Sequence, residues 1–232
     1  MKTVGVITIG QAPRDDVVPD LEKILGPEVQ VVQAGALDGL GREAIASLAP
    51  ASGQYPLITR LLDGASVVIA KEAIIPLLQG CLDRLAAPRN SPSPRSEAPG
   101  ATAFAILCTG VFPRFRSIWP VLEPDRLLFG VAQAIVGAGP LGVIIPIEGQ
   151  RAAATAHWSR IVPEPTLAVA SPYADAATLV EASERLRGAG ARVVVMDCMG
   201  FTAPARKVVR DITGAAVLLP SSLVARVLAD IA

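Results

Sequence analysis

Short runs that are apolar at every position alternate along the chain with segments of helical periodicity. The strand candidates are 3–9, 29–34, 66–70, 102–108, 141–147, 166–170, 192–197 and 216–219. Helices are predicted at 14–25, 42–48, 55–62, 73–86, 124–136, 150–160, 174–188, 203–211 and 221–231. Continuously apolar strands are typical of a parallel sheet that helices cover on both faces. The pattern therefore predicts an α/β protein, with a surface loop around "SPSP" within 88–100.

The longest apolar run, 127–147, has the length of a transmembrane helix. However, "GAGP" at 137–140 interrupts it, and no basic cluster flanks it. A helix that ends near Val136 and a strand that begins at Leu141 explain the run better, so we expect no membrane partner.

Two segments of the chain resemble each other. "VGVITIGQ" (4–11) and "LGVIIPIEGQ" (141–150) both read Gly-Val-Ile and then reach Gly-Gln. Each continues into a predicted helix and another apolar strand. An internal duplication is the simplest account. It predicts two pseudo-symmetric lobes, each a mainly parallel sheet flanked by helices, with a cleft between them. The first lobe would comprise 1–122 plus 216–232, and the second 123–215.

Composition limits the partners. Hydrophobic residues make up 51% of the 232 residues, and Lys plus Arg equals Asp plus Glu at 21 each, without a run of like charge. The chain thus offers no broad surface for nucleic acid, and a small molecule is the expected ligand. Three cysteines without CxxC spacing and a single histidine, His157, argue against a disulfide framework and a metal site. The N-terminal apolar run is too short for a signal peptide, so we expect a cytoplasmic protein.

A cysteine ends two of the apolar runs. "FAILCTGVF" (104–112) reaches Cys108, and "VVVMDCMGF" (193–201) reaches Asp197 and Cys198. In parallel α/β sheets, ligands collect beyond the carboxyl ends of the strands. We therefore expect a site formed by Gly10, Gln11, Cys108, Thr109, Gly110, Asp197, Cys198 and Gly200. The alternative is that both cysteines are small buried hydrophobic residues, as we expect for Cys81 in its helical segment.

Other candidates lie in loops after predicted strands. In "GQAPR" (10–14), Gln11 and Arg14 are the residues most able to bind an anion, although the segment also reads as a turn with a helix start. Ser171 and Tyr173 in "SPY" and Asp38 in "GALDG" follow equivalent strands and could equally be parts of simple turns.

A set of motifs along the whole chain is similar to the AroM protein family. They are "TIGQAPR" (8–14), "GALDGL" (35–40), "YPLITRLLDG" (55–64), "LCTG" (107–110), "EPDRLL" (123–128), "SPY" (171–173) and "DCMGF" (197–201). The family is distantly similar to the aspartate/glutamate racemase superfamily, with its hydantoin racemases and maleate isomerases. The resemblance implies two lobes that each place one catalytic cysteine on the cleft, here Cys108 and Cys198, and no cofactor.

The resemblance implies a racemase or isomerase that acts on a small carboxylate or carbonyl compound. Racemisation needs two bases on opposite faces of one carbon, and thiols can supply them. Two features fit this resemblance less well. Thr109 stands where typical amino-acid racemases carry an asparagine after the first cysteine. Asp197, if its carboxylate lies close to the Cys198 sulfur, would oppose formation of the thiolate. A non-catalytic carboxylate-binding protein and a lyase with one thiolate remain as alternatives. The sequence leaves a homo-oligomer open.

Overall fold

The computed structural model describes residues 2–86 and 100–232, so most of the predicted "SPSP" loop lies outside the described residues. The chain divides into two compact units, Met1–Pro124 with Val224–Ala232, and Asp125–Leu223. Residues 216–223 belong to the second unit, whereas the sequence-based boundary lies at 215. Their strand, β10 (Ala216–Leu218), pairs with a strand of the second unit, β9 (Val193–Met196).

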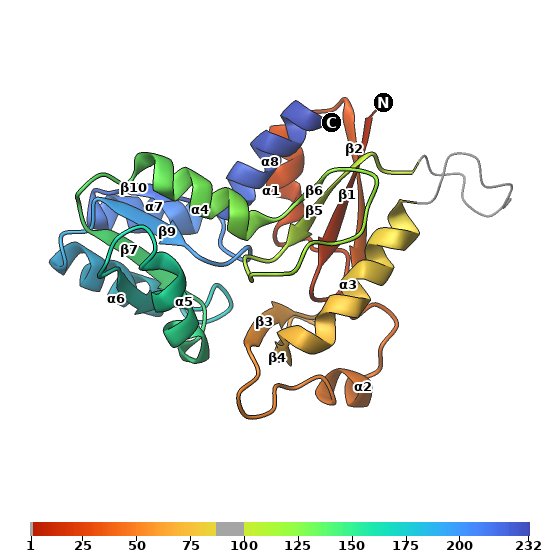
Figure 1. The fold of residues 1–232 in the computed structure, drawn as a ribbon, viewed down its shortest axis with the longest axis horizontal. Coiled ribbons are helices and arrows are strands. Elements are labelled where there is room, and N and C mark those ends of the chain that lie inside the picture. The colour runs from red at the N-terminus through yellow and green to blue at the C-terminus, as the bar shows by residue number, and fades with distance from the viewer. Residues whose placement is uncertain (1, 87–99) are drawn as a thin grey trace, which may run out of the picture. The chain divides into compact units, whose positions relative to one another are not determined.

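The first unit contains a four-stranded sheet in the order β2-β1-β5-β6 (Figure 1). Its strands are β1 (Lys2–Thr8), β2 (Val29–Gly35), β5 (Ala103–Leu107) and β6 (Val121–Leu122), and every pair is parallel. The helices are α1 (Val18–Leu25), α2 (Arg42–Ala46) and α3 (Lys71–Leu85). The continuously apolar strands are buried, as the pattern predicts: β5 is buried at all five positions.

The prediction of a helix over 55–62 is wrong. Residues Pro56–Arg60 form strand β3, which pairs with β4 (Ser66–Ala70) in an antiparallel hairpin separate from the main sheet. The apolar residues of "YPLITRLL" match helical spacing, but the Asp63-Gly64 pair between two apolar runs is a hairpin signal. Gly64 adopts φ +85°, which glycine tolerates in such a turn.

The second unit contains a sheet in the order β8-β7-β9-β10, again with every pair parallel. Its other strands are β7 (Leu141–Ile145) and β8 (Thr166–Val169). Around it lie α4 (Pro124–Ile135), the 3-10 helix η1 (Glu148–Gln150), α5 (Arg151–Trp158), α6 (Ala176–Gly188) and α7 (Ala203–Thr213). Helix α8 (Pro220–Ile231) begins in the second unit and ends in the first.

The two sheets have the same strand order, with β1, β2, β5 and β6 matching β7, β8, β9 and β10. The predicted α/β class with two parallel-sheet lobes is confirmed; the internal duplication stays a prediction. The apolar run 127–147 is divided between α4 and β7. Within 2–86 and 100–232, no helix combines the length and apolarity that a membrane crossing requires.

Alternate residues of β9 face two different apolar clusters of the second unit. Val193 and Val195 belong to a cluster that includes Trp158 of α5. Val194 and Met196 belong to a second cluster, to which residues of α6 and α7 contribute. This alternation is the ordinary geometry of a strand. The same alternation places the side chains of Asp197 and Cys198, which follow β9, on opposite faces of the sheet.

Candidate functional site

Both cysteines of interest follow a strand at a switch in chain direction. In the first sheet the chain passes from β1 to β2 on one side and later returns to β5 on the other side. The carboxyl ends of β1 and β5 therefore form a topological switch point, where open α/β sheets bind ligands. Cys108 directly follows β5. In the second sheet β7 and β9 form the same arrangement, and Cys198 lies two residues beyond β9.

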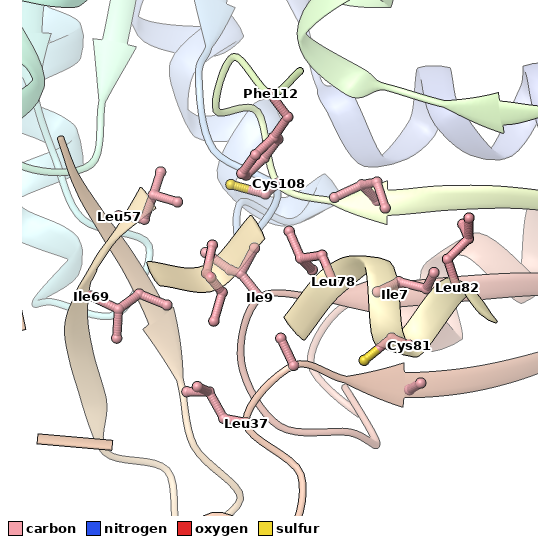
Figure 2. Packing of buried hydrophobic residues seen from close by; sticks show 14 of the residues in the cluster. Ile7, Ile9, Leu37, Leu57, Ile69, Leu78, Cys81, Leu82, Cys108 and Phe112 are labelled. Carbon is pink, nitrogen blue, oxygen red and sulfur yellow. The ribbon is translucent and has the colours of Figure 1, made fainter. Parts of the chain in front are cut away.

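Cys108 lies at the edge of an apolar cluster in the first unit. Its exposed fraction is 8%, and Figure 2 shows Phe112 beside it and Leu57 of β3 in the same apolar cluster. The backbone N–H of Gly110 donates to Cys108 Sγ at 3.3 Å. A donor at sulfur stabilises negative charge there, while apolar surroundings oppose it. The structure thus provides Cys108 with one donor suited to a thiolate.

Cys198 lies in a tight turn at the end of β9. Its backbone N–H donates to Met196 O at 2.8 Å, and Phe201 N–H donates to Cys198 O at 3.3 Å. Cys198 is also 8% exposed and belongs to the cluster of Val194 and Met196. The two cysteines thus share their place in the sheet and their degree of burial.

Cys81 differs from both. It lies within α3, is 1% exposed, and accepts a hydrogen bond at Sγ from the Arg84 guanidinium at 3.2 Å. Burial raises the pKa of the Cys81 thiol, against the opposing effect of Arg84. The predicted packing role of Cys81 is confirmed. All three cysteines are free.

Gly10 and Gln11 hold the β3–β4 hairpin against the loop after β1. A Cβ atom on Gly10 would lie 2.4 Å from Thr59 Oγ1 and 2.5 Å from Arg60 O, so only glycine permits this approach. Gln11 Oε1 accepts from the Leu62 N–H at 3.0 Å, and Gln11 Nε2 donates to a backbone carbonyl at 3.5 Å. Both polar ends of this predicted ligand-binding side chain therefore contact backbone.

Arg14 is 4% exposed, and its guanidinium already contacts a carboxylate. Nε and Nη2 donate to the two Asp16 oxygens at 2.7 and 2.8 Å, and Nη1 donates to Thr8 Oγ1 at 3.0 Å. Burial raises the pKa of Asp16, but the hydrogen bond and charge of Arg14 outweigh it, so the pKa lies below its usual value. Asp38 is also used locally: its carboxylate accepts from Ala12 N–H and Gly35 N–H.

In the second unit the structure brings Ser171, Tyr173 and Gly200 together. Ser171 Oγ accepts from Tyr173 N–H at 3.2 Å, and a Cβ on Gly200 would lie 2.6 Å from Tyr173 Oη. A pocket of about 290 Å³ opens beside them, between the loops that follow β8 and β9. Its lining is mainly apolar and comprises Ser171, Pro172, Ala174, Asp175, Ala176, Leu179, Gly200, Phe201, Thr202, Pro204, Ala205 and Val208.

Sequence reasoning missed two groups around the cysteines. The predicted helix over 55–62 includes Leu57 and Thr59, but both lie in β3 and approach the loops after β1 and β5. Trp158 was not singled out, yet its indole N–H donates to Asp197 at 2.9 Å. His157 lies against the Phe129 and Trp158 rings and 3.1 Å from Asp125. Over 2–86 and 100–232 there is no group of three or more His, Cys, Asp or Glu that could hold a metal ion.

Known proteins of similar fold include racemases and a decarboxylase. Allantoin racemase from Pseudomonas fluorescens aligns at 12% identity over 98% of this chain and 89% of its own, with a TM-score of 0.57. Picrophilus torridus aspartate racemase aligns at 11% identity over 99% and 95%, also with 0.57. Unliganded arylmalonate decarboxylase aligns at 16% identity over 99% and 93%, with 0.56. At these identities the likeness shows the fold.

Sequence comparison identifies the family. No curated protein matches the chain in sequence. The model of the AroM protein family matches residues 4–232, which is nearly the whole chain and includes both strand-end cysteines. The chain therefore belongs to the AroM protein family.

Proposed function

We propose that this protein is a cofactor-independent racemase or isomerase of a small carboxylate or carbonyl compound. In this proposal Cys108 and Cys198 act on one substrate. The observation that carries it is the matching place of the two thiols. Each follows a strand that borders the switch point of a parallel sheet, and the two sheets have the same strand order.

The chemistry needs one thiolate and one thiol. The thiolate removes the proton from the substrate carbon, and the electron pair moves into the adjacent carbonyl to give an enolate. The opposite thiol then donates its proton to the other face of the same carbon. In an isomerase, one thiolate would instead add to a carbon–carbon double bond while the other thiol protonates the neighbouring carbon. The Gly110 N–H at Cys108 Sγ is a donor that would stabilise a thiolate formed there.

The substrate-binding residues are assigned by their place around the two thiols. Thr109 and Gly110 follow Cys108 in the first unit, and Gly10 and Gln11 shape the loop beside them. Ser171, Tyr173 and Gly200 follow the strands of the second unit. Ser171 and Gly200 border the 290 Å³ pocket, which suits an apolar part of the substrate. Arg14 would bind a substrate carboxylate only by releasing Asp16, so we assign it to the support of the loop after β1.

A second candidate function is a carboxylate-binding protein without turnover. Two observations favour it. The side chains of Gln11 and Arg14, the expected anion ligands, are already paired within the protein. In addition, both thiols are nine-tenths buried in apolar clusters, as small hydrophobic residues would be. The fold likeness to arylmalonate decarboxylase keeps a one-thiolate lyase as a third candidate.

Proton exchange tests the proposal directly. Enantiopure 2-substituted carboxylates and hydantoins would be incubated with the protein in D₂O, and loss of the proton at the chiral carbon followed by NMR together with optical rotation. We expect one class of substrate to exchange and to lose its optical activity. Cys108→Ser and Cys198→Ser should each abolish racemisation, because two bases must flank the carbon, although exchange from one face can persist.

The matched control is Cys81→Ser, which changes the third thiol and should leave turnover intact. Binding of a carboxylate without exchange, unaffected by either cysteine substitution, would favour the non-catalytic protein. Release of CO₂ that depends on only one of the two cysteines would favour the lyase.

A further inference from the structure

Asp197 occupies the last position on the sheet before the Cys198 turn. Its backbone N–H donates to Ile144 O of β7 at 2.8 Å and so extends the β7–β9 ladder beyond Met196. The next N–H, that of Cys198, turns back to Met196 O. The direction in which the thiol leaves the sheet is therefore set at Asp197.

The Asp197 side chain is held on the face opposite to the thiol. Trp158 Nε1 donates to Asp197 Oδ2 at 2.9 Å. Trp158 is 1% exposed and belongs to the cluster of Val193 and Val195, whereas Cys198 belongs to the cluster on the other face of the strand. Strand alternation thus continues through Asp197 and Cys198. The carboxylate contacts helix α5, while the thiol faces the cluster that α6 and α7 cover.

We propose that Asp197 is a positioning residue, which acts through the Trp158 indole to fix the orientation of Cys198. The inference rests on the proposed function, since it assigns a role to Cys198. A buried indole N–H needs an acceptor, and Asp197, which directly precedes Cys198, provides it while its backbone N–H bonds to β7. Catalytic groups must be held within about 0.5 Å of their productive geometry. A contact that fixes the Cys198 turn would therefore affect the reaction rate.

The alternative role for Asp197 is electrostatic: a carboxylate beside a thiol opposes the thiolate. Substitutions separate the two roles. Asp197→Asn keeps an oxygen that accepts from the indole and removes the charge. Asp197→Ala removes both. Trp158→Phe keeps an aromatic ring and removes the donor. Trp119→Phe is the matched control, because it makes the same change at the other tryptophan, which lies in the first unit.

The experiment measures iodoacetamide alkylation of Cys198 by site-resolved mass spectrometry as a function of pH. Cys108 in the same sample serves as an internal reference. Trp158→Phe and Asp197→Ala should each raise the limiting alkylation rate of Cys198 by about fivefold or more, because the turn opens locally. Asp197→Asn should stay within about twofold of the unchanged protein, with the same midpoint pH. Trp119→Phe should have no effect at Cys198.

Two results would overturn the inference. One is an unchanged rate in Trp158→Phe when the same sample melts cooperatively. The other is an Asp197→Asn midpoint that falls to lower pH, which would show control by charge. Alkylation requires no turnover, so a failure of the proposed function, with exchange insensitive to both cysteines, is seen separately from a failure of the positioning role. Once proton exchange has identified a substrate, Trp158→Phe should lower kcat for that substrate by up to about 100-fold at nearly unchanged KM.

Discussion

At Gly10, strand β3 approaches the loop that follows β1. Glycines after a first strand often permit a ligand to approach the backbone, and the sequence suggested this role here. The structure gives Gly10 a packing reason, because Thr59 and the Arg60 carbonyl occupy the space that a Cβ atom would need. Gly200 is similar, with Tyr173 Oη in that space. Close packing of neighbouring segments is therefore enough to explain why Gly10 and Gly200 are glycines.

Substitution of Gly10 tests this packing role. Gly10→Ala should lower the free energy of unfolding by about 1–3 kcal/mol, the usual cost of overpacking. The contacts at 2.4 and 2.5 Å involve a β-branched side chain and backbone, neither of which can rotate away freely. Gly130→Ala in α4 is the control: nothing lies within 4 Å of its added Cβ, so it should gain about 0.5–1 kcal/mol. Urea denaturation measures both, and equal effects would contradict the packing argument.

The elements differ in how far the sequence could predict them. Cys108 and Cys198 were placed correctly at strand ends, because β5 and β9 are apolar at every position and therefore read as buried parallel strands. The hairpin could not be read from periodicity, since its apolar residues satisfy helical spacing. The hydrogen-bond partners of the Gln11 and Arg14 side chains also could not be predicted from the sequence. Leu62 lies 51 residues from Gln11, and the choice of Asp16 as the partner of Arg14 depends on the buried loop conformation.

The hairpin β3–β4 depends on Gln11 for its contact with the loop after β1. Gln11→Ala removes the acceptor of the Leu62 N–H. Hydrogen–deuterium exchange should accelerate at the hairpin turn, and unfolding free energy should fall by about 0.5–1.5 kcal/mol. The matched control is Gln79→Ala, because Gln79 Oε1 accepts from Arg116 N–H at 2.9 Å in another loop. Exchange in that variant should accelerate near Arg116 and not at Leu62; the same pattern in both would contradict a local role.

At the scale of the whole molecule, the chain passes between the units twice, near Pro124 and near Val224. Each unit holds one strand-end thiol, so neither unit contains the complete proposed site. This division explains why the two cysteines lie about 90 residues apart in sequence while serving, in our proposal, one carbon atom. It also gives the proposal a test that depends on the intact chain and on no knowledge of the substrate.

Thiol cross-linking provides that test. Two sulfurs that serve one carbon from opposite faces should approach to about 7 Å around a ligand, since reacting atoms lie about 3–3.5 Å apart. In a Cys81→Ala background, dibromobimane should therefore bridge Cys108 and Cys198 within one molecule, detected as a fluorescent adduct joining two peptides. Cys108→Ser in the same background should take up the reagent at Cys198 alone and stay dark. Single alkylation of both thiols without a bridge, with and without candidate carboxylates, would contradict a shared substrate and favour the binding protein.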